Sequence, residues 1–207
     1  MIEPLAVGVL VSGNGSNLQA IIDRIEADSL PVRIACVISN KADAFGLERA
    51  RKHGIPAIHI DHRAHGGRES YDAALVETLR GHGVQLVVLA GFMRIVTSVL
   101  LDAFPNAVMN IHPALLPAFP GLHAQAQALR YGVKFSGCTV HFVDEGTDTG
   151  PIIIQAVVPV LDDDDEASLS ARIQVEEHRT YPEAVRLFAE RRLRIEGRKV
   201  SMLPPGA

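Results

Sequence analysis

The sequence has few of the residues that build disulfide scaffolds or membrane spans. Two of its 207 residues are cysteine and none is tryptophan. Two thiols supply neither a disulfide framework nor a zinc ligand set, and both Cys36 and Cys138 lie in apolar runs, so we expect reduced core residues. No apolar run approaches the roughly 20 residues that span a bilayer, and the first residues lack a basic leader region. These absences predict a cytoplasmic protein.

An excess of positive charge is also missing. The chain has 20 Lys and Arg against 24 Asp and Glu, a formal net charge of −4. This balance argues against a protein that binds nucleic acid through its overall charge. A chain of this length with 47% hydrophobic residues can bury a sizeable core, and we expect a single domain. The predicted partners are small-molecule substrates rather than nucleic acid or a membrane, and the sequence leaves monomer or homodimer open.

Apolar runs of strand length alternate with stretches of helical period as far as residue 111. The helical period is clear in Leu18, Ile21 and Ile25, which follow the first run. Such alternation predicts βαβ units in a parallel sheet, whose strands are covered on both faces. The predicted strands are 5–12, 32–39, 56–60, 84–91 and 106–112.

The pattern changes after residue 112. A Pro-rich loop precedes a predicted helix near 122–131, and the two long runs 136–144 and 151–161 are expected to form an antiparallel pair. Four consecutive aspartates at 162–165 then suit a solvated turn and helix cap better than a metal site. The predicted fold is therefore α/β, a Rossmann-like open twisted sheet, mostly parallel with antiparallel C-terminal strands and helices on both faces. Within the single domain we expect a phosphate-binding or nucleotide-binding half (1–111), a second half (112–190) and a C-terminal tail (191–207).

The first motif with chemical potential is SGNGSNLQAII, residues 12–22, where the first strand passes into the first helix. Gly13 and Gly15 allow a tight turn, and Ser16 or Asn17 is expected to cap the helix, whose N-terminus favours an anion. Leu18 replaces the third glycine of a dinucleotide fingerprint, so one phosphate is the better prediction. A tight turn without a ligand is the alternative.

The second motif combines the segments AGFMRIV (90–96) and NIHPALLPAFPGLHA (110–124), each of which follows a strand. Asn110 and His112 alternate along an extended stretch, so their side chains leave on the same face. An amide can stabilise a developing oxyanion and an imidazole can donate a proton near neutral pH. The pair suits acyl transfer, although a structural histidine is also possible on this pattern.

The third motif is DEGTDTGPIIIQ, residues 144–155, a loop too long for a plain hairpin. A carboxylate here can orient an imidazole or relay a proton. By spacing alone Asp144, Glu145 and Asp148 are equal candidates, and a polar turn without a role is as plausible. The remaining histidines show no metal-binding spacing and no nucleophile elbow is present, so neither a metal nor a serine acyl-enzyme is expected.

Together these motifs resemble the phosphoribosylglycinamide formyltransferase family. The likeness runs from Leu10 to about Pro182, and the H-P-x-L-L-P segment is shared with all formyltetrahydrofolate-using transferases, whereas the Gly-Asn-Gly-Ser-Asn loop points to the glycinamide ribonucleotide branch. The segments that carry it are SGNGSNLQAI, SNKADAFGLERA, VVLAGFMRI, NIHPALLP, PGLHA and HFVDEGTDTGPIIIQ.

The resemblance implies a reaction and a set of site residues, and it makes residues 112–190 the folate-binding and catalytic half. The formyl group of 10-formyltetrahydrofolate, the co-substrate, passes to the amine of 5′-phosphoribosylglycinamide in purine (IMP) biosynthesis, by direct attack and without a metal. The catalytic three are Asn110, His112 and Asp148. The matched phosphoribosylglycinamide-binding residues are Gly15, Ser16, Asn17, Leu18, Gln19 and Glu177. The matched folate-binding residues are Arg68, Met93, Arg94, Ile95, Val96 and Asn110.

Departures from the family pattern are modest. Ala114 stands where many relatives have Ser, and Ala118 and Phe119 stand where a basic residue and Tyr are common, which puts folate rim contacts in doubt. Three alternatives remain. Formyltetrahydrofolate hydrolase normally has an additional N-terminal domain, for which a phosphate loop that begins at residue 12 leaves no room, and methionyl-tRNA formyltransferase is longer and needs a tRNA-binding domain that we do not expect in this mildly acidic chain. The third alternative is a non-catalytic phosphate-binding module. The hydrolase is the nearest rival.

Overall fold

The computed structural model describes residues 4–206, which divide into two compact units with a boundary between Asn110 and Ile111. In the first unit the strands follow the order β3-β2-β1-β4-β5, and every pairing between them is parallel. The strand bounds are β1 Leu5–Val11, β2 Val32–Ser39, β3 Ala57–His59, β4 Leu86–Leu89 and β5 Val108–His112. The predicted parallel sheet of βαβ units is thus confirmed.

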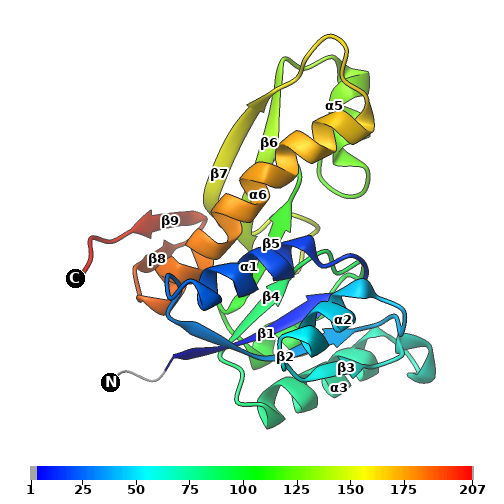
Figure 1. Cartoon of the computed structure of the whole chain (residues 1–207), viewed down its shortest axis with the longest axis vertical. Helices are drawn as coiled ribbons and strands as arrows, with labels where there is room; N and C mark the ends of the chain where they lie inside the picture. Colours follow the sequence, from blue (N-terminus) through cyan, green and yellow to red (C-terminus); the bar gives the residue numbers. More distant parts are fainter. Residues whose placement is uncertain (1–3, 207) are drawn as a thin grey trace. The chain divides into compact units, whose positions relative to one another are not determined.

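Helices connect these strands as the apolar spacing predicts. Helices α1 and α2 contact β2 (Figure 1), and α3 packs on α4. Their bounds are α1 Ser16–Glu26, α2 Phe45–Lys52, α3 Arg68–Gly81 and α4 Ser98–Ala103, with a short 3-10 helix at His62–Ala64. Leu18, Ile21 and Leu47 are fully buried, as expected for the core-facing stripes of amphipathic helices. The short helix α4 was not predicted from the sequence.

Several predicted strands are longer than the observed ones, for local backbone reasons. The run 106–112 yields a strand only from Val108, because Asn106 has a left-handed φ of 54°. In the run 84–91, Val84 is not part of the strand, because its N–H donates to the Leu79 carbonyl at the C-terminal end of α3. The strand also ends before Gly91, where φ is 73°. Some residues that apolar composition assigns to strands therefore lie in turns instead.

The second unit is built on an antiparallel pair, β6 Phe135–Phe142 and β7 Ile152–Pro159, as predicted. The long helix α6 Glu166–Ala189 packs against both strands and against α5 Ala124–Tyr131 (Figure 1). Asp165 is the N-cap of α6 and forms a reciprocal capping box with Ser168, so the predicted cap in the aspartate run is confirmed. With these strands the fold class is the predicted mixed open sheet.

The segment 191–207, expected to be a tail, contains a hairpin within its described part. Strands β8 Leu193–Glu196 and β9 Lys199–Met202 pair antiparallel, and β9 meets β7 at the register pair Ile152 and Lys199. Gly197 sits in the two-residue turn with a φ of 59°. A two-residue turn with this glycine is a hairpin signal that the sequence does contain.

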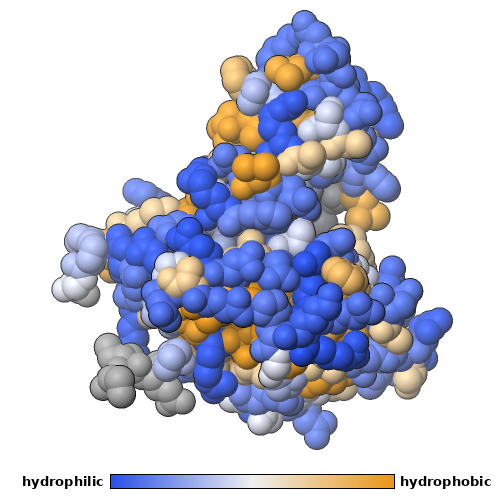
Figure 2. Space-filling model, viewed as in Figure 1, coloured by the Kyte–Doolittle hydropathy of each residue, from blue (hydrophilic) through white to orange (hydrophobic). Residues whose placement is uncertain are grey.

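The face seen in Figure 2 is mostly hydrophilic, with hydrophobic residues in separate patches. Cys36 and Cys138 are buried and free, as expected, and burial raises the pKa of each thiol to about 11. Within residues 4–206, no helix combines the length and the apolar character that crossing a membrane requires.

Candidate functional site

The loop after β1 leads into helix α1, and the residue at the junction is a glycine in the left-handed conformation. Gly15 is the N-cap with a φ of 71°, and Ser16 and Asn17 are the first two residues of the helix, so the expectation that Ser16 or Asn17 is the N-cap is wrong. A Cβ on Gly15 would lie 2.8 Å from the Gly46 Cα, an approach that only glycine permits. A glycine N-cap brings no side chain of its own to the N-terminus of α1, and a helix N-terminus favours an anion.

Ser12 ties this loop to two others in the same unit. Its hydroxyl donates to Asn40 Oδ1 at 2.6 Å and accepts the N–H of Met93 at 2.8 Å. Its own N–H donates to the Gly91 carbonyl at 3.0 Å. The loops that follow β1, β2 and β4 are therefore joined at one side chain, at the carboxyl ends of parallel strands, where ligands bind in such sheets.

The segment after β4 presents both apolar and charged groups. Met93 and Ile95 expose 64% and 55% of their surface, whereas Val96 is buried. The Arg94 guanidinium carbon lies 5.2 Å from the ring centroid of Tyr71, a cation–π distance. Arg68, the first residue of α3, is exposed.

Tyr71 is itself held by aromatic neighbours. His62 and His65 meet its ring edge-on at centroid distances of 6.2 and 5.6 Å. Burial raises the pKa of its phenol to about 12, so the hydroxyl stays protonated. The next residue, Asp72, accepts from the Thr97 hydroxyl at 2.8 Å, and desolvation raises the pKa of this carboxyl.

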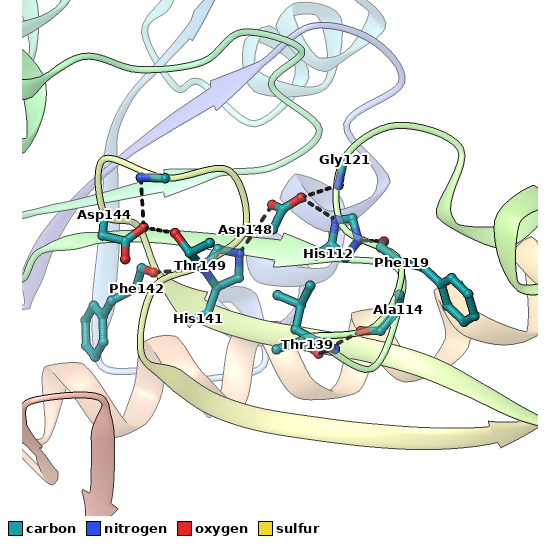
Figure 3. A network of polar contacts seen from close by, with 12 residues as sticks. His112, Ala114, Phe119, Gly121, Thr139, His141, Phe142, Asp144, Asp148 and Thr149 are labelled. Carbon is teal, nitrogen blue, oxygen red and sulfur yellow. Dashed lines mark hydrogen bonds and ion pairs between the residues drawn. The ribbon is translucent and has the colours of Figure 1, made fainter.

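The second unit brings His112 and Asp148 together (Figure 3). His112 ends β5 and is 5% exposed, and its Nδ1 lies 3.3 Å from Asp148 Oδ2. Its other nitrogen, Nε2, lies 2.8 Å from the Phe119 carbonyl oxygen. A carbonyl only accepts, so this hydrogen bond requires a proton on Nε2. The carboxyl group of Asp148 faces the other ring nitrogen, Nδ1.

Asp148 has further support on each side. Its Oδ2 accepts the Gly121 N–H at 2.8 Å, and its Oδ1 lies 3.7 Å from Nε2 of His141. His141 is 2% exposed, its Nδ1 lies 2.8 Å from the Phe142 carbonyl, and burial lowers the pKa of its ring. Burial therefore favours the uncharged form of the His141 ring. His141 was considered in the sequence only as a metal ligand, and its place beside Asp148 was missed.

The three acidic residues of the loop between β6 and β7 have different surroundings. Asp144 Oδ1 accepts from the Thr149 hydroxyl at 2.6 Å and from the Gly146 N–H at 3.2 Å (Figure 3). It fastens the loop, while Glu145 is exposed. Of the three candidates left open by spacing, the structure places Asp148 at the imidazole.

The H-P-x-L-L-P loop is fixed on β6 by Thr139. The Thr139 hydroxyl donates to the Ala114 carbonyl at 2.7 Å and accepts the Leu116 N–H at 3.0 Å. The Gln155 amide on β7 donates to the Leu116 carbonyl at 2.9 Å. Ala114 is fully buried, so its departure from the family pattern concerns the inner wall of the loop and not a rim.

Backbone conformation is unusual at this site. Three of its non-glycine residues have a left-handed φ: Phe119 at 54°, His123 at 59° and Asp148 at 55°. Such residues cost about 1 kcal/mol or more and persist where the surroundings enforce them. At Phe119 and Asp148 this conformation brings the carbonyl of Phe119 and the carboxyl group of Asp148 into contact with the His112 ring.

The remaining predicted site residues lie in defined elements. Asn110 is half-buried on β5, two residues before His112, so both side chains leave the same face as expected. Glu177 is 9% exposed on α6. Among residues 4–206, no three His, Cys, Asp or Glu side chains cluster as metal ligands would.

The chain is similar to proteins of known activity. Phosphoribosylglycinamide formyltransferase of Escherichia coli is 46% identical over 187 residues, which are 90% of this chain and 88% of that protein. The trifunctional purine biosynthetic protein adenosine-3 of Drosophila melanogaster is 51% identical over 88% of this chain, which spans 14% of that protein's length.

Solved structures agree with these relatives. Glycinamide ribonucleotide transformylase 1 from Symbiobacterium toebii is 58% identical, with a TM-score of 0.97 and 99% and 96% of the two chains covered. A formyltetrahydrofolate deformylase from Pseudomonas syringae is 30% identical with a TM-score of 0.89, and 66% of it is covered. The formyl transferase family matches residues 5–185. The chain belongs to the formyl transferase family.

Proposed function

We propose that this chain transfers the formyl group of 10-formyltetrahydrofolate to the amine of 5′-phosphoribosylglycinamide. The products are the N-formyl compound and tetrahydrofolate, as in de novo purine biosynthesis in the cytoplasm. The observation that carries the proposal is the buried His112 imidazole, held between the Phe119 carbonyl and the Asp148 carboxylate. Such a ring supplies N–H donors at a fixed place, which formyl transfer requires and phosphate binding alone does not.

The reaction moves one carbon between two nitrogens. The substrate amine forms a bond to the formyl carbon, the bond from that carbon to the folate nitrogen breaks, and one proton passes from the amine to the leaving nitrogen. His112 and the Asn110 amide donate to the formyl oxygen as negative charge develops there. Asp148 stabilises the imidazolium and helps to move the proton. Since His112 Nε2 already donates to the Phe119 carbonyl, that bond is shared or exchanged when the oxyanion forms.

The first unit supplies binding groups that fit both substrates. The N–H groups of the loop at Gly15, with the beginning of α1, suit the substrate phosphate. The family resemblance also assigns Glu177 of α6 to 5′-phosphoribosylglycinamide. The exposed Met93 and Ile95 offer apolar surface to a pterin ring. Arg94 and Arg68 suit the carboxylates of a folate tail, while buried Val96 supports the segment that carries them.

The test is to mix the purified protein with 10-formyltetrahydrofolate, with and without 5′-phosphoribosylglycinamide, and to follow deformylated folate by absorbance. Product that forms only with the amine supports the transferase. Release without the amine would indicate a hydrolase, the activity named for the Pseudomonas syringae relative. Binding of both compounds with no release would contradict catalysis altogether.

A further inference from the structure

Arg49 on α2 reaches back to the loop that follows β1, more than 30 residues earlier in the sequence. Its Nε donates to the Asn14 carbonyl at 2.9 Å and its Nη2 donates to Asn14 Oδ1 at 2.9 Å. Its Nη1 donates to Gln19 Oε1 at 3.1 Å. Each guanidinium nitrogen therefore holds one acceptor, and the two residues so held flank the segment 15–18.

The guanidinium is also fixed on its face. Its central carbon lies 4.7 Å from the centroid of the Phe45 ring, one turn earlier on α2. The N–H groups of a guanidinium lie in its own plane and point outward, so packing over an aromatic face leaves them available for hydrogen bonds. Phe45 is 40% exposed, and its ring centroid also lies 5.6 Å from the Lys52 ammonium nitrogen, so it contacts two cations of the same helix.

Helix α2 supports the same loop through its backbone. The Gly46 N–H donates to the Gly13 carbonyl at 3.0 Å, and the Gly46 Cα is close enough to Gly15 to exclude a side chain there. The loop is thus held by backbone contact at Gly46 and by a three-pronged side chain at Arg49. A lysine, with one compact ammonium group, cannot reproduce the fork.

We propose that Arg49 is a positioning residue for the phosphate-binding loop. It holds Asn14 and Gln19 in place, and with them the backbone N–H groups between, and it acts through the loop rather than as a ligand of the phosphate. The inference rests on the proposed function, in which this loop binds the phosphate of 5′-phosphoribosylglycinamide.

The test compares Arg49→Lys, Arg49→Ala and Arg51→Ala by steady-state kinetics with each substrate varied in turn. Arg49→Lys and Arg49→Ala are both expected to raise KM for 5′-phosphoribosylglycinamide roughly tenfold, with kcat and KM for 10-formyltetrahydrofolate little changed. Arg51→Ala removes the same charge from an exposed position of the same helix and should leave all three parameters close to those of the unaltered chain. Thermal unfolding of each variant shows whether the fold is retained.

Three results would overturn the inference. If Arg49→Lys behaves as the unaltered chain, positive charge alone is enough, as it would be for a direct phosphate ligand. If Arg49→Ala leaves KM unchanged while Gly15→Ala raises it, the loop binds phosphate without help from Arg49. If neither Arg49→Ala nor Gly15→Ala changes KM for 5′-phosphoribosylglycinamide, the loop does not bind the phosphate, and the proposed binding mode is wrong as well.

Discussion

Oδ2 of Asp148 is shared by two donors, the backbone N–H of Gly121 at 2.8 Å and, at 3.3 Å, Nδ1 of the His112 ring. Asp148→Asn keeps the size of the side chain and loses the charge that stabilises the imidazolium. We expect kcat to fall by about 10²–10⁴ with small changes in KM.

The control is Asp144→Asn, in the same loop, where the side chain fastens Thr149 and Gly146. Its kcat should fall far less than that of Asp148→Asn. Equal losses in the two variants would mean that loop structure matters and the carboxylate at the imidazole does not.

His112→Ala removes the donor itself. One lost oxyanion donor commonly costs about 10²–10³ in rate and a lost acid or base about 10²–10⁴, so turnover should be severely impaired. The measurement is single-turnover formyl transfer at saturating substrate. Near-normal turnover would contradict the mechanism.

His141 makes stability depend on pH in a predictable direction. Burial lowers the pKa of its ring below the ordinary value of 6.5, so the unfolded chain binds the proton more tightly than the folded one. The free energy of unfolding should therefore fall as pH drops below 6.5, at up to about 1.4 kcal/mol per pH unit for one proton.

Urea unfolding between pH 5 and 7.5 measures this slope. His141→Asn retains a donor toward the Phe142 carbonyl and should flatten the slope, whereas His59→Asn, at an exposed position of β3, should leave it unchanged. A slope that survives in His141→Asn would assign the effect to another group.

The two glycines of the phosphate loop are expected to differ. Gly15→Ala forces a left-handed residue with a Cβ 2.8 Å from the Gly46 backbone, so KM for 5′-phosphoribosylglycinamide should rise about tenfold or more. Gly13 has no positive φ and nothing within 4 Å of an added Cβ. Gly13→Ala should have a much smaller effect, and kinetics that rank the two variants the other way would refute the steric argument.

Tyr71 should matter for folate binding through Arg94. Tyr71→Leu removes the ring under the guanidinium and is expected to raise KM for 10-formyltetrahydrofolate about threefold to tenfold, while Tyr71→Phe should not. Leu75→Ala, one turn along α3 and equally buried, controls for general destabilisation. If Leu75→Ala raises the same KM equally, the ring has no specific role.

Much of the fold could be predicted because its strands are near-continuous apolar runs. Residues 32–39 form β2 with the predicted bounds. The hairpin of β8 and β9 was missed because its four-residue strands carry charged side chains such as Arg194 and Lys199 and are only partly buried. Short, half-exposed strands leave little periodicity to detect.

The site was predictable in its residue types and not in its contacts. Spacing could not decide between Asp144 and Asp148, because both lie in an irregular loop whose direction depends on a left-handed residue at position 148. Nor could it show that His141 lies near Asp148, since that depends on the register between β6 and β7, which shifts between Val140 and His141. The motif Gly-Asn-Gly-Ser-Asn likewise does not predict the contact with Arg49, because Arg49 lies on the following helix, α2.

The hydroxyl of Ser12 has a consequence for anyone who redesigns this enzyme. It joins Asn40 to the backbone of Met93, so the loop assigned to the phosphate and the segment assigned to the folate share one fastening point. The two specificities are therefore not independent modules. Substitutions selected at 93–96 for a new formyl donor will show epistasis with substitutions at 13–19, and libraries that vary the two segments together should find solutions that stepwise selection misses.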